Sequence, residues 1–236
     1  MKKIRYCRVQ LEDELKSYEI NALRGAVADA VSKAIGRENE ESILFHNHVP
    51  EKKYNQGYPL IQYKRIKNKP TIIFLEAAVD VAHHFFANAP TNLKIHTHLI
   101  STEIAELVLK QPTLQVWDSM FTYKILDYAA IREKNKVQFD SLDNLKDKII
   151  FLEKMLISHI VAFALNIGWA INEQKRVEVS ILDILKHKTI PFKEIDWDAF
   201  DLVFKTNVSL PNFIGLGNHV SVGWGVIKNI QPENEW

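Results

Sequence analysis

The chain has 236 residues, of which 47% are hydrophobic and 25% are charged, and its formal net charge is +1. This balance is typical of a globular protein, and the length suits one large domain or two domains of about a hundred residues each. Cys7 is the only cysteine, which excludes a disulfide framework and a cysteine-based zinc site. The near-zero charge neither requires nor excludes nucleic acid, because acidic surface can balance a local basic groove.

The sequence predicts neither a signal peptide nor a membrane span. Residues 1–6 carry charges that no apolar stretch follows. The longest apolar run, 155–171, is interrupted by polar residues and is too short to cross a bilayer, so we expect a buried helix there. With a single cysteine, a reduced, cytoplasmic location is the expectation.

The first part of the chain predicts the order β-α-β-β-α-β, which is that of a ferredoxin-like unit. Alternating β-favouring residues indicate the strands, and apolar residues at three- and four-residue spacing indicate the helices. The expected elements are a strand at 3–10, a helix at 18–35, an extended stretch at 43–46, strands at 58–64 and 71–75, a helix at 76–88 and a strand at 93–100. We place this domain at residues 1–103.

Residues 104–236 predict a second, degenerate unit of the same kind. Its expected elements are a strand at 112–125, a long helix at 142–172, extended stretches at 176–185 and 199–208, and a last strand at 220–228. The second helix of the unit is missing or displaced, and a Gly-rich segment lies near its place. The predicted fold is therefore α+β, with two tandem ferredoxin-like (RRM-like) domains and a C-terminal Gly-rich loop.

The Gly-rich segment, residues 208–228, holds four of the eight glycines, at 215, 217, 223 and 225, together with His219. Glycines at this density indicate a backbone that needs positive φ or close approach to a ligand. Backbone N–H groups in such a loop can cradle phosphates. A hairpin that only turns the chain is the alternative, and both interpretations stay open on composition alone.

Two closely spaced histidines, His46 and His48, could present both imidazoles to one site, because positions i and i+2 of a strand share a face. A histidine pair can act as general base and general acid near neutral pH, which suits metal-free RNA cleavage. Surface histidines before a proline and metal ligation are the alternatives. For His96 and His98 we expect a solvent-facing strand, for His83 and His84 packing roles in a helix, and for His159 a hydrogen-bonded core position.

A basic stretch follows, with Lys52, Lys53, Lys64 and Arg65 among six basic residues between 51 and 69 against one acid. Tyrosines at 54, 58 and 63 interleave with them. Lysine and arginine bind phosphates, and tyrosines stack on unpaired bases, so the stretch favours RNA binding. A solvated charged hairpin is the alternative.

Three features together resemble the CRISPR-associated endoribonucleases that cut precursor CRISPR RNA in its repeat. These are the histidine pair after the first helix, the sequence YPLIQYK at 58–64, and the glycine pairs of the C-terminal segment. The family is the Cas six family of the RAMP superfamily, and the chain looks closest to its subtype I-B branch.

The resemblance implies metal-independent transesterification without a cofactor, leaving a 2′,3′-cyclic phosphate and a 5′-hydroxyl. We assign His48 as general acid or base and His46 as its partner, Tyr54 or Tyr58 as a hydrogen-bonding stabiliser, and Lys52 and Lys64 as charges facing the phosphate. The RNA-binding residues expected are Lys52, Lys53, Lys64, Arg65, Gly215, Gly217, His219, Gly223 and Gly225.

The partners implied are CRISPR repeat RNA, that is precursor crRNA, and subunits of an interference complex, with homodimer formation left open. One departure from the family concerns the Gly-rich segment, which has only Lys205 and Lys228 as nearby bases. We therefore expect this segment to act mainly through backbone approach and packing. A non-catalytic repeat-binding subunit and a histidine-based metal-dependent enzyme are the alternative functions.

Overall fold

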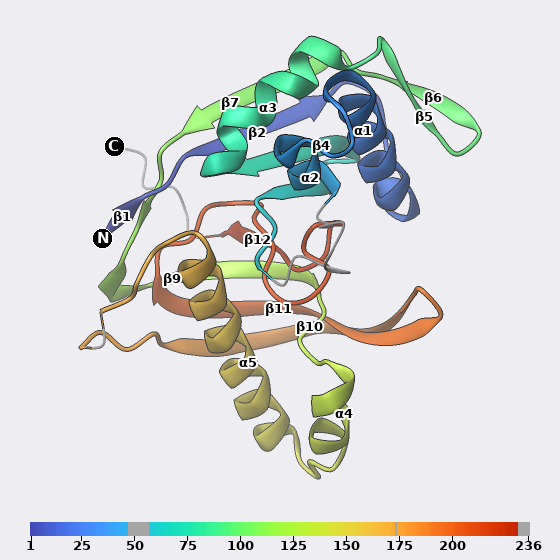
Figure 1. Cartoon of the computed structure of the whole chain (residues 1–236). Coiled ribbons are helices and arrows are strands. Elements are labelled where there is room, and N and C mark those ends of the chain that lie inside the picture. The colour runs from blue at the N-terminus through green and yellow to red at the C-terminus, as the bar shows by residue number, and fades with distance from the viewer. Residues whose placement is uncertain (47–56, 173, 231–236) are drawn as a thin grey trace. The chain divides into compact units, whose positions relative to one another are not determined.

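The computed structural model describes residues 1–46, 57–172 and 174–230, and the chain divides into two compact units (Figure 1). The N-terminal unit comprises Lys3–Pro112 together with Ser221–Gly223. The C-terminal unit comprises Met1–Lys2, Thr113–Val220 and the described residues from Trp224 onward. Three residues of the Gly-rich segment thus belong to the N-terminal unit, although they come late in the chain.

The N-terminal unit is a four-stranded antiparallel sheet with the order β3-β4-β2-β7. Helices α1 and α3 lie on one face of it (Figure 1). The main elements are β2 (Tyr6–Leu11), α1 (Ile20–Ile35), α2 (Glu40–His46), β3 (Ile61–Ile66), β4 (Lys69–Leu75), α3 (Ala77–Asn88) and β7 (Ile104–Lys110). In chain order these strands give the arrangement 4-1-3-2 of a ferredoxin-like unit.

Local chemistry explains two features of this unit. In α1, Leu23, Val27 and Val31 recur at helical spacing and are fully buried, and a 3₁₀ turn (Ser17–Glu19) precedes the helix. The turn between β3 and β4 places Lys67 and Asn68 at φ of 51° and 65°. Two consecutive positive φ angles match the twist of a tight hairpin, as expected for a turn between the strands predicted at 58–64 and 71–75.

Three predictions for this unit were wrong. Residues 43–46 belong to helix α2 rather than to an extended stretch, because Ser42 and Phe45 are buried at helical spacing. Residues 93–100 form a hairpin, β5 (Asn92–Ile95) and β6 (His98–Ser101), which turns where His96 has φ of 50°. The fourth strand of the sheet is therefore β7, which pairs with β2. The N-terminal unit extends to Pro112, whereas the boundary expected after residue 103 would have left β7 outside it.

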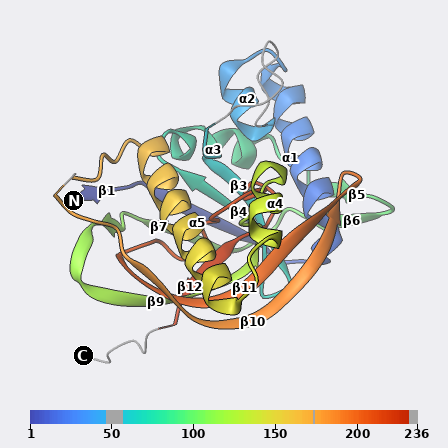
Figure 2. The same ribbon diagram turned by 90° about the horizontal axis from the view of Figure 1, so that it is seen from below.

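The C-terminal unit repeats this topology with a four-stranded sheet in the order β10-β11-β9-β12. Helices α4 and α5 lie on the same side of the long β10–β11 hairpin (Figure 2). The main elements are β9 (Val116–Tyr128), α4 (Glu133–Asp140), α5 (Leu145–Asn166), β10 (Val179–Phe192), β11 (Ile195–Val208) and β12 (Val226–Asn229), with short strands β1 (Lys2–Lys3) and β8 (Thr113–Leu114) elsewhere. A loop, residues 209–225, stands where the second helix would be, so the prediction of two tandem ferredoxin-like units is confirmed.

Helix α5 is shorter than the predicted 142–172 because both of its ends are capped. The Asn144 side chain accepts a hydrogen bond from the Asp147 N–H at 2.9 Å. At the other end Gly168 has φ of 72°, a left-handed geometry that stops a helix. Among the described residues, α5 is the one helix long and apolar enough to cross a membrane by length and composition. Its apolar residues Leu152, Leu156, Ile160 and Phe163 are buried inside the unit instead.

Candidate functional site

His46, the predicted catalytic partner, is the last residue of α2 and is held by a serine pair. Its Nε2 lies 2.8 Å from Ser32 Oγ on α1, and Ser32 Oγ lies 2.6 Å from Ser42 Oγ. Ser42 precedes His46 by four positions, so both face α1 from the same side of α2. Ser32 and Ser42 are buried, so the hydroxyl that contacts the imidazole ring is itself held inside the unit.

The strand geometry expected for the histidine pair is wrong at His46, because the backbone there is helical. The other predicted residues of this region, namely His48, Lys52, Lys53 and Tyr54, lie outside the described residues. Tyr58 is half-buried immediately before β3, and Arg65 is exposed, with its Nε donating to the carbonyl oxygen of Leu15. Arg65 therefore keeps a surface position compatible with a phosphate contact.

Lys64 and Tyr63 do not occupy the surface positions that phosphate binding and base stacking require. Both are fully buried, and Tyr63 donates its hydroxyl hydrogen to the Phe45 carbonyl at 3.3 Å. Lys64 pairs with Thr71, which pairs with Gln10, so the three share one row on one face of the sheet. Burial lowers the pKa of Lys64 to about 7. The role expected for Lys64 opposite a phosphate is corrected to a buried position within the sheet.

The buried lysine predicts a pH-dependent stability. The unfolded chain holds the Lys64 proton up to a pKa of about 10.4, whereas the folded chain releases it at about pH 7. Between these values the unfolded state binds more protons, so the free energy of unfolding rises with pH, by about 1.4 kcal/mol per unit for this group. Lys64→Met should flatten this slope in urea unfolding between pH 7 and 9, and Lys94→Met, which alters an exposed lysine, should leave it unchanged. Equal slopes in all three proteins would contradict the assignment.

The glycines of the Gly-rich segment are required by close backbone packing. A Cβ on Gly225, whose φ is 62°, would lie 1.8 Å from the Leu216 carbonyl oxygen. A Cβ on Gly217, whose φ is 96°, would lie 2.9 Å from the Tyr128 ring. Gly215 is buried and forms a β-bridge with Val226. These contacts favour the expectation that the segment acts through packing.

Residues Ser221–Gly223 pack on the N-terminal unit to which they belong. The Tyr63 N–H donates to the Ser221 carbonyl at 2.9 Å, and Val222 forms a parallel bridge with Tyr63. They thus pair with β3, which stands at the edge of its sheet. Gly223 has φ of 94°, and a Cβ there would lie 2.6 Å from Ile20 Cδ1.

His219 lies among aromatic rings of the C-terminal unit rather than on an open surface. Its ring centroid is 4.4 Å from that of Trp197, 4.5 Å from that of Phe192 and 4.9 Å from that of Trp224. Desolvation, followed by the charges of Lys193 and Arg132, lowers the pKa of His219 to about 4. Its ring is therefore neutral at physiological pH.

Asn218, which precedes His219 in the Gly-rich segment, is fixed by hydrogen bonds. The Asn218 N–H and side-chain amide both donate to the Ala129 carbonyl, at 3.1 and 2.8 Å, and Arg132 Nε donates to Asn218 Oδ1 at 2.7 Å.

His159 Nδ1 lies 2.7 Å from the Tyr128 hydroxyl oxygen, which confirms a hydrogen-bonded, partly buried position. Burial also lowers the pKa of His159 to about 4.

Comparison with known proteins identifies the family. The Cas6b N-terminal domain matches residues 2–113, and the Cas6b C-terminal domain matches residues 115–230. The chain belongs to the Cas6b family. A crystal structure of Cas6b is 22% identical, with a TM-score of 0.83 over 97% of this chain and 100% of that one. A second, of the CRISPR RNA processing endoribonuclease Cas6b, is 20% identical with a TM-score of 0.71 over 97% and 100%.

A protein of Methanocaldococcus jannaschii that is described as uncharacterised is 24% identical over 141 residues, which is 59% of this chain and 92% of that protein. The two Cas6b domain matches confirm the family resemblance inferred from the sequence. The solved structures are below 25% identity, so they show a shared fold.

Four further histidines of this Cas6b family member lie on α3 and on the β5–β6 hairpin of the N-terminal unit. His83 is exposed, so a packing role is wrong for it, whereas His84 is half-buried with its Nε2 2.5 Å from Glu41 Oε2. His96 and His98 are exposed, as predicted, but at a hairpin turn. Within residues 1–46, 57–172 and 174–230, no three side chains of histidine, cysteine, aspartate or glutamate gather as metal ligands would.

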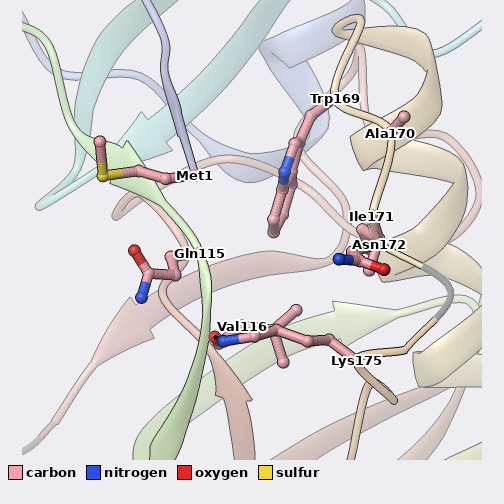
Figure 3. Close-up of a pocket in the computed structure, with 8 residues that line it drawn as sticks. All are labelled: Met1, Gln115, Val116, Trp169, Ala170, Ile171, Asn172 and Lys175. Atoms are coloured by element: carbon pink, nitrogen blue, oxygen red, sulfur yellow. Dashed lines mark hydrogen bonds between the residues drawn. The ribbon is translucent and has the colours of Figure 1, made fainter.

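A pocket of about 270 Å³ in the C-terminal unit has, among its described lining residues, none of those that the sequence analysis proposed for the site (Figure 3). Trp169 and Lys175 line it, with Lys175 Nζ donating to the Val116 carbonyl at 3.2 Å. Sequence reasoning also missed Ser32, Ser42, Phe192 and Trp197. Ser32 lies within the helix predicted at 18–35, whereas the helix that carries Ser42 was not predicted, so no signal in the sequence indicated the pair.

Proposed function

We propose that this member of the Cas6b family is a metal-independent endoribonuclease that cleaves CRISPR repeat RNA. The match of both halves of the chain to the Cas6b domains carries the proposal. One solved structure of similar fold is titled a CRISPR RNA processing endoribonuclease. The product would be a guide RNA that passes to an interference complex in the cytoplasm.

In the proposed mechanism the 2′-hydroxyl attacks the adjacent phosphorus while the bond to the 5′-oxygen breaks. The products are a 2′,3′-cyclic phosphate and a 5′-hydroxyl. His46 and His48 carry out the two proton transfers: one accepts the proton of the 2′-hydroxyl, and the other donates a proton to the leaving 5′-oxygen. The hydroxyl of Ser32, 2.8 Å from His46 Nε2, supports this role because it fixes the ring for proton transfer at a single position.

Tyr54 or Tyr58 would stabilise the phosphorane by hydrogen bonding. Lys52, Lys53 and Arg65 would contact the RNA phosphates. Among the residues assigned to this part of the mechanism, Tyr58 and Arg65 are described by the structure, and Arg65 is exposed. Gly215, Gly217, Gly223 and Gly225 would shape the wall beside the RNA through packing.

The direct test incubates end-labelled repeat RNA with the protein in EDTA and analyses the termini of the products. We expect cleavage at one position, a 5′-hydroxyl, and a cyclic phosphate that acid opens. Binding of the repeat RNA without cleavage would instead show a non-catalytic subunit. Cleavage that EDTA abolishes and added divalent metal restores would show a metal-dependent enzyme.

Ser32 predicts a positioning effect on catalysis. Ser32→Ala removes the hydroxyl that holds His46 Nε2, so we expect the single-turnover cleavage rate to fall by about ten-fold with unchanged RNA affinity. Ser42→Ala removes the hydroxyl that contacts Ser32 Oγ but leaves the contact between Ser32 and His46, so the cleavage rate should fall by a smaller factor. Equal rates for the wild type and Ser32→Ala would remove Ser32 from the mechanism.

A further inference from the structure

A second feature of the C-terminal unit is the ring cluster formed by Phe192, Trp197, His219 and Trp224. The ring centroids of Phe192 and Trp224 lie 5.5 Å apart, and His219 lies within 4.9 Å of each of the other three. The Trp197 ring stands perpendicular to that of His219, at 90°. Phe192, Trp197 and His219 are only half-buried, so the cluster keeps exposed aromatic surface.

The backbone builds this cluster from two distant segments. Phe192 ends β10 and Trp197 begins β11, and the turn between them places Lys193 and Glu194 at φ of 50° and 64°. The pairing of Phe192 with Ile195 brings Phe192 and Trp197 to the same face of the hairpin. His219, with φ of 57°, supplies its ring from the Gly-rich segment.

Two cationic side chains lie near the cluster. Lys193 Nζ lies 5.8 Å from the centre of the Phe192 ring, and the charge of Arg132 acts on His219. The nearest acidic residues of β11, Asp196 and Asp198, alternate with Trp197 and so point to the opposite face. There Asp198 pairs with Lys136 and His187.

One polar atom of the cluster lacks a partner. His219 Nε2 is buried and makes no hydrogen bond among the residues that the structure describes. A buried ring nitrogen in this state costs free energy unless a ligand satisfies it.

We propose that the ring cluster is a stacking site for an unpaired nucleobase of RNA, with Lys193 and Arg132 attracting the adjoining phosphates. Aromatic faces bounded by cations suit a single-stranded nucleotide, because the base stacks while the backbone stays beside the charges. The site deepens the proposed function and rests on it: the cluster would hold one repeat nucleotide and select RNA that is unpaired at that position.

The test measures binding in EDTA of a 2′-O-methyl repeat RNA, which lacks the attacking hydroxyl and stays uncleaved. Trp197→Leu should weaken binding by about ten-fold, the usual effect of losing one stacked base. Trp197→Phe, which keeps a ring, should restore most of the affinity. Trp117→Leu is the matched control, since Trp117 is a second solvent-accessible tryptophan of this unit, at 39% exposure, and lies outside the cluster.

Abasic substitutions then identify the nucleotide. One abasic position should weaken wild-type binding by about the same ten-fold factor and should have no further effect on Trp197→Leu, because both changes remove the same contact. Thermal unfolding verifies that each variant is folded. Equal RNA affinity of folded Trp197→Leu and wild type, or additive losses at every abasic position, overturns the stacking site while leaving cleavage of unmodified repeat RNA unaffected. Conversely, coupled losses in a protein that cleaves no repeat RNA would retain the stacking site and refute the proposed nuclease.

Discussion

Replacing His48 with alanine is expected to reduce cleavage of repeat RNA by about 10²–10⁴-fold, the usual contribution of one positioned general acid or base. His46→Ala should produce a loss of similar size, because the two imidazoles carry different protons in the same step. The measurement is a single-turnover rate in EDTA with saturating protein. Under these conditions the affinity for RNA should change little, since both histidines act in the transition state.

The matched control for these variants is His96→Ala, which removes an exposed histidine from the β5–β6 hairpin of the same unit. Its cleavage rate should equal that of the wild type. Undiminished cleavage by both His46→Ala and His48→Ala would refute the catalytic assignment while leaving repeat recognition intact. A loss confined to His48→Ala would reassign His46 to structure, held by Ser32 at the end of α2.

Substituting Gly225 with alanine is expected to destabilise the protein by roughly 2–5 kcal/mol, combining the cost of a left-handed backbone with that of overpacking. The residue has φ of 62°, and the new Cβ would fall 1.8 Å from the Leu216 carbonyl oxygen. Backbone atoms cannot move aside as a flexible side chain does. The segment between β11 and β12 must therefore shift, and urea unfolding measures the cost.

Gly25→Ala is expected to change the stability in the opposite direction. Gly25 is exposed within α1, and a Cβ there has no atom within 4 Å. Alanine should stabilise the helix by about 0.5–1 kcal/mol, because glycine loses more conformational entropy on folding. If the urea midpoint of unfolding of Gly225→Ala equals that of the wild type, the close packing described for Gly225 is contradicted.

The sequence by itself determined the fold class, the family and most of the regular elements. Helix α1 was predictable because its apolar residues recur at helical spacing and Gly36 ends it. The turn at residues 67 and 68, between two strongly β-favouring runs, was predictable for similar reasons. Even the absence of a second helix in the C-terminal unit could be read from the glycines of the Gly-rich segment. These properties depend on neighbours within about ten residues.

Only the tertiary structure decided which residues of the candidate site face solvent. Lys64 follows the same basic pattern as Arg65, yet one is fully buried and the other exposed. Alternation along the strand does not account for this, because Tyr63 shares the face of Arg65 and is fully buried. The serine pair that holds His46 and the ring cluster around His219 join residues that are distant in the chain. No local pattern encodes such contacts, because they depend on which sheet faces and loops meet after folding.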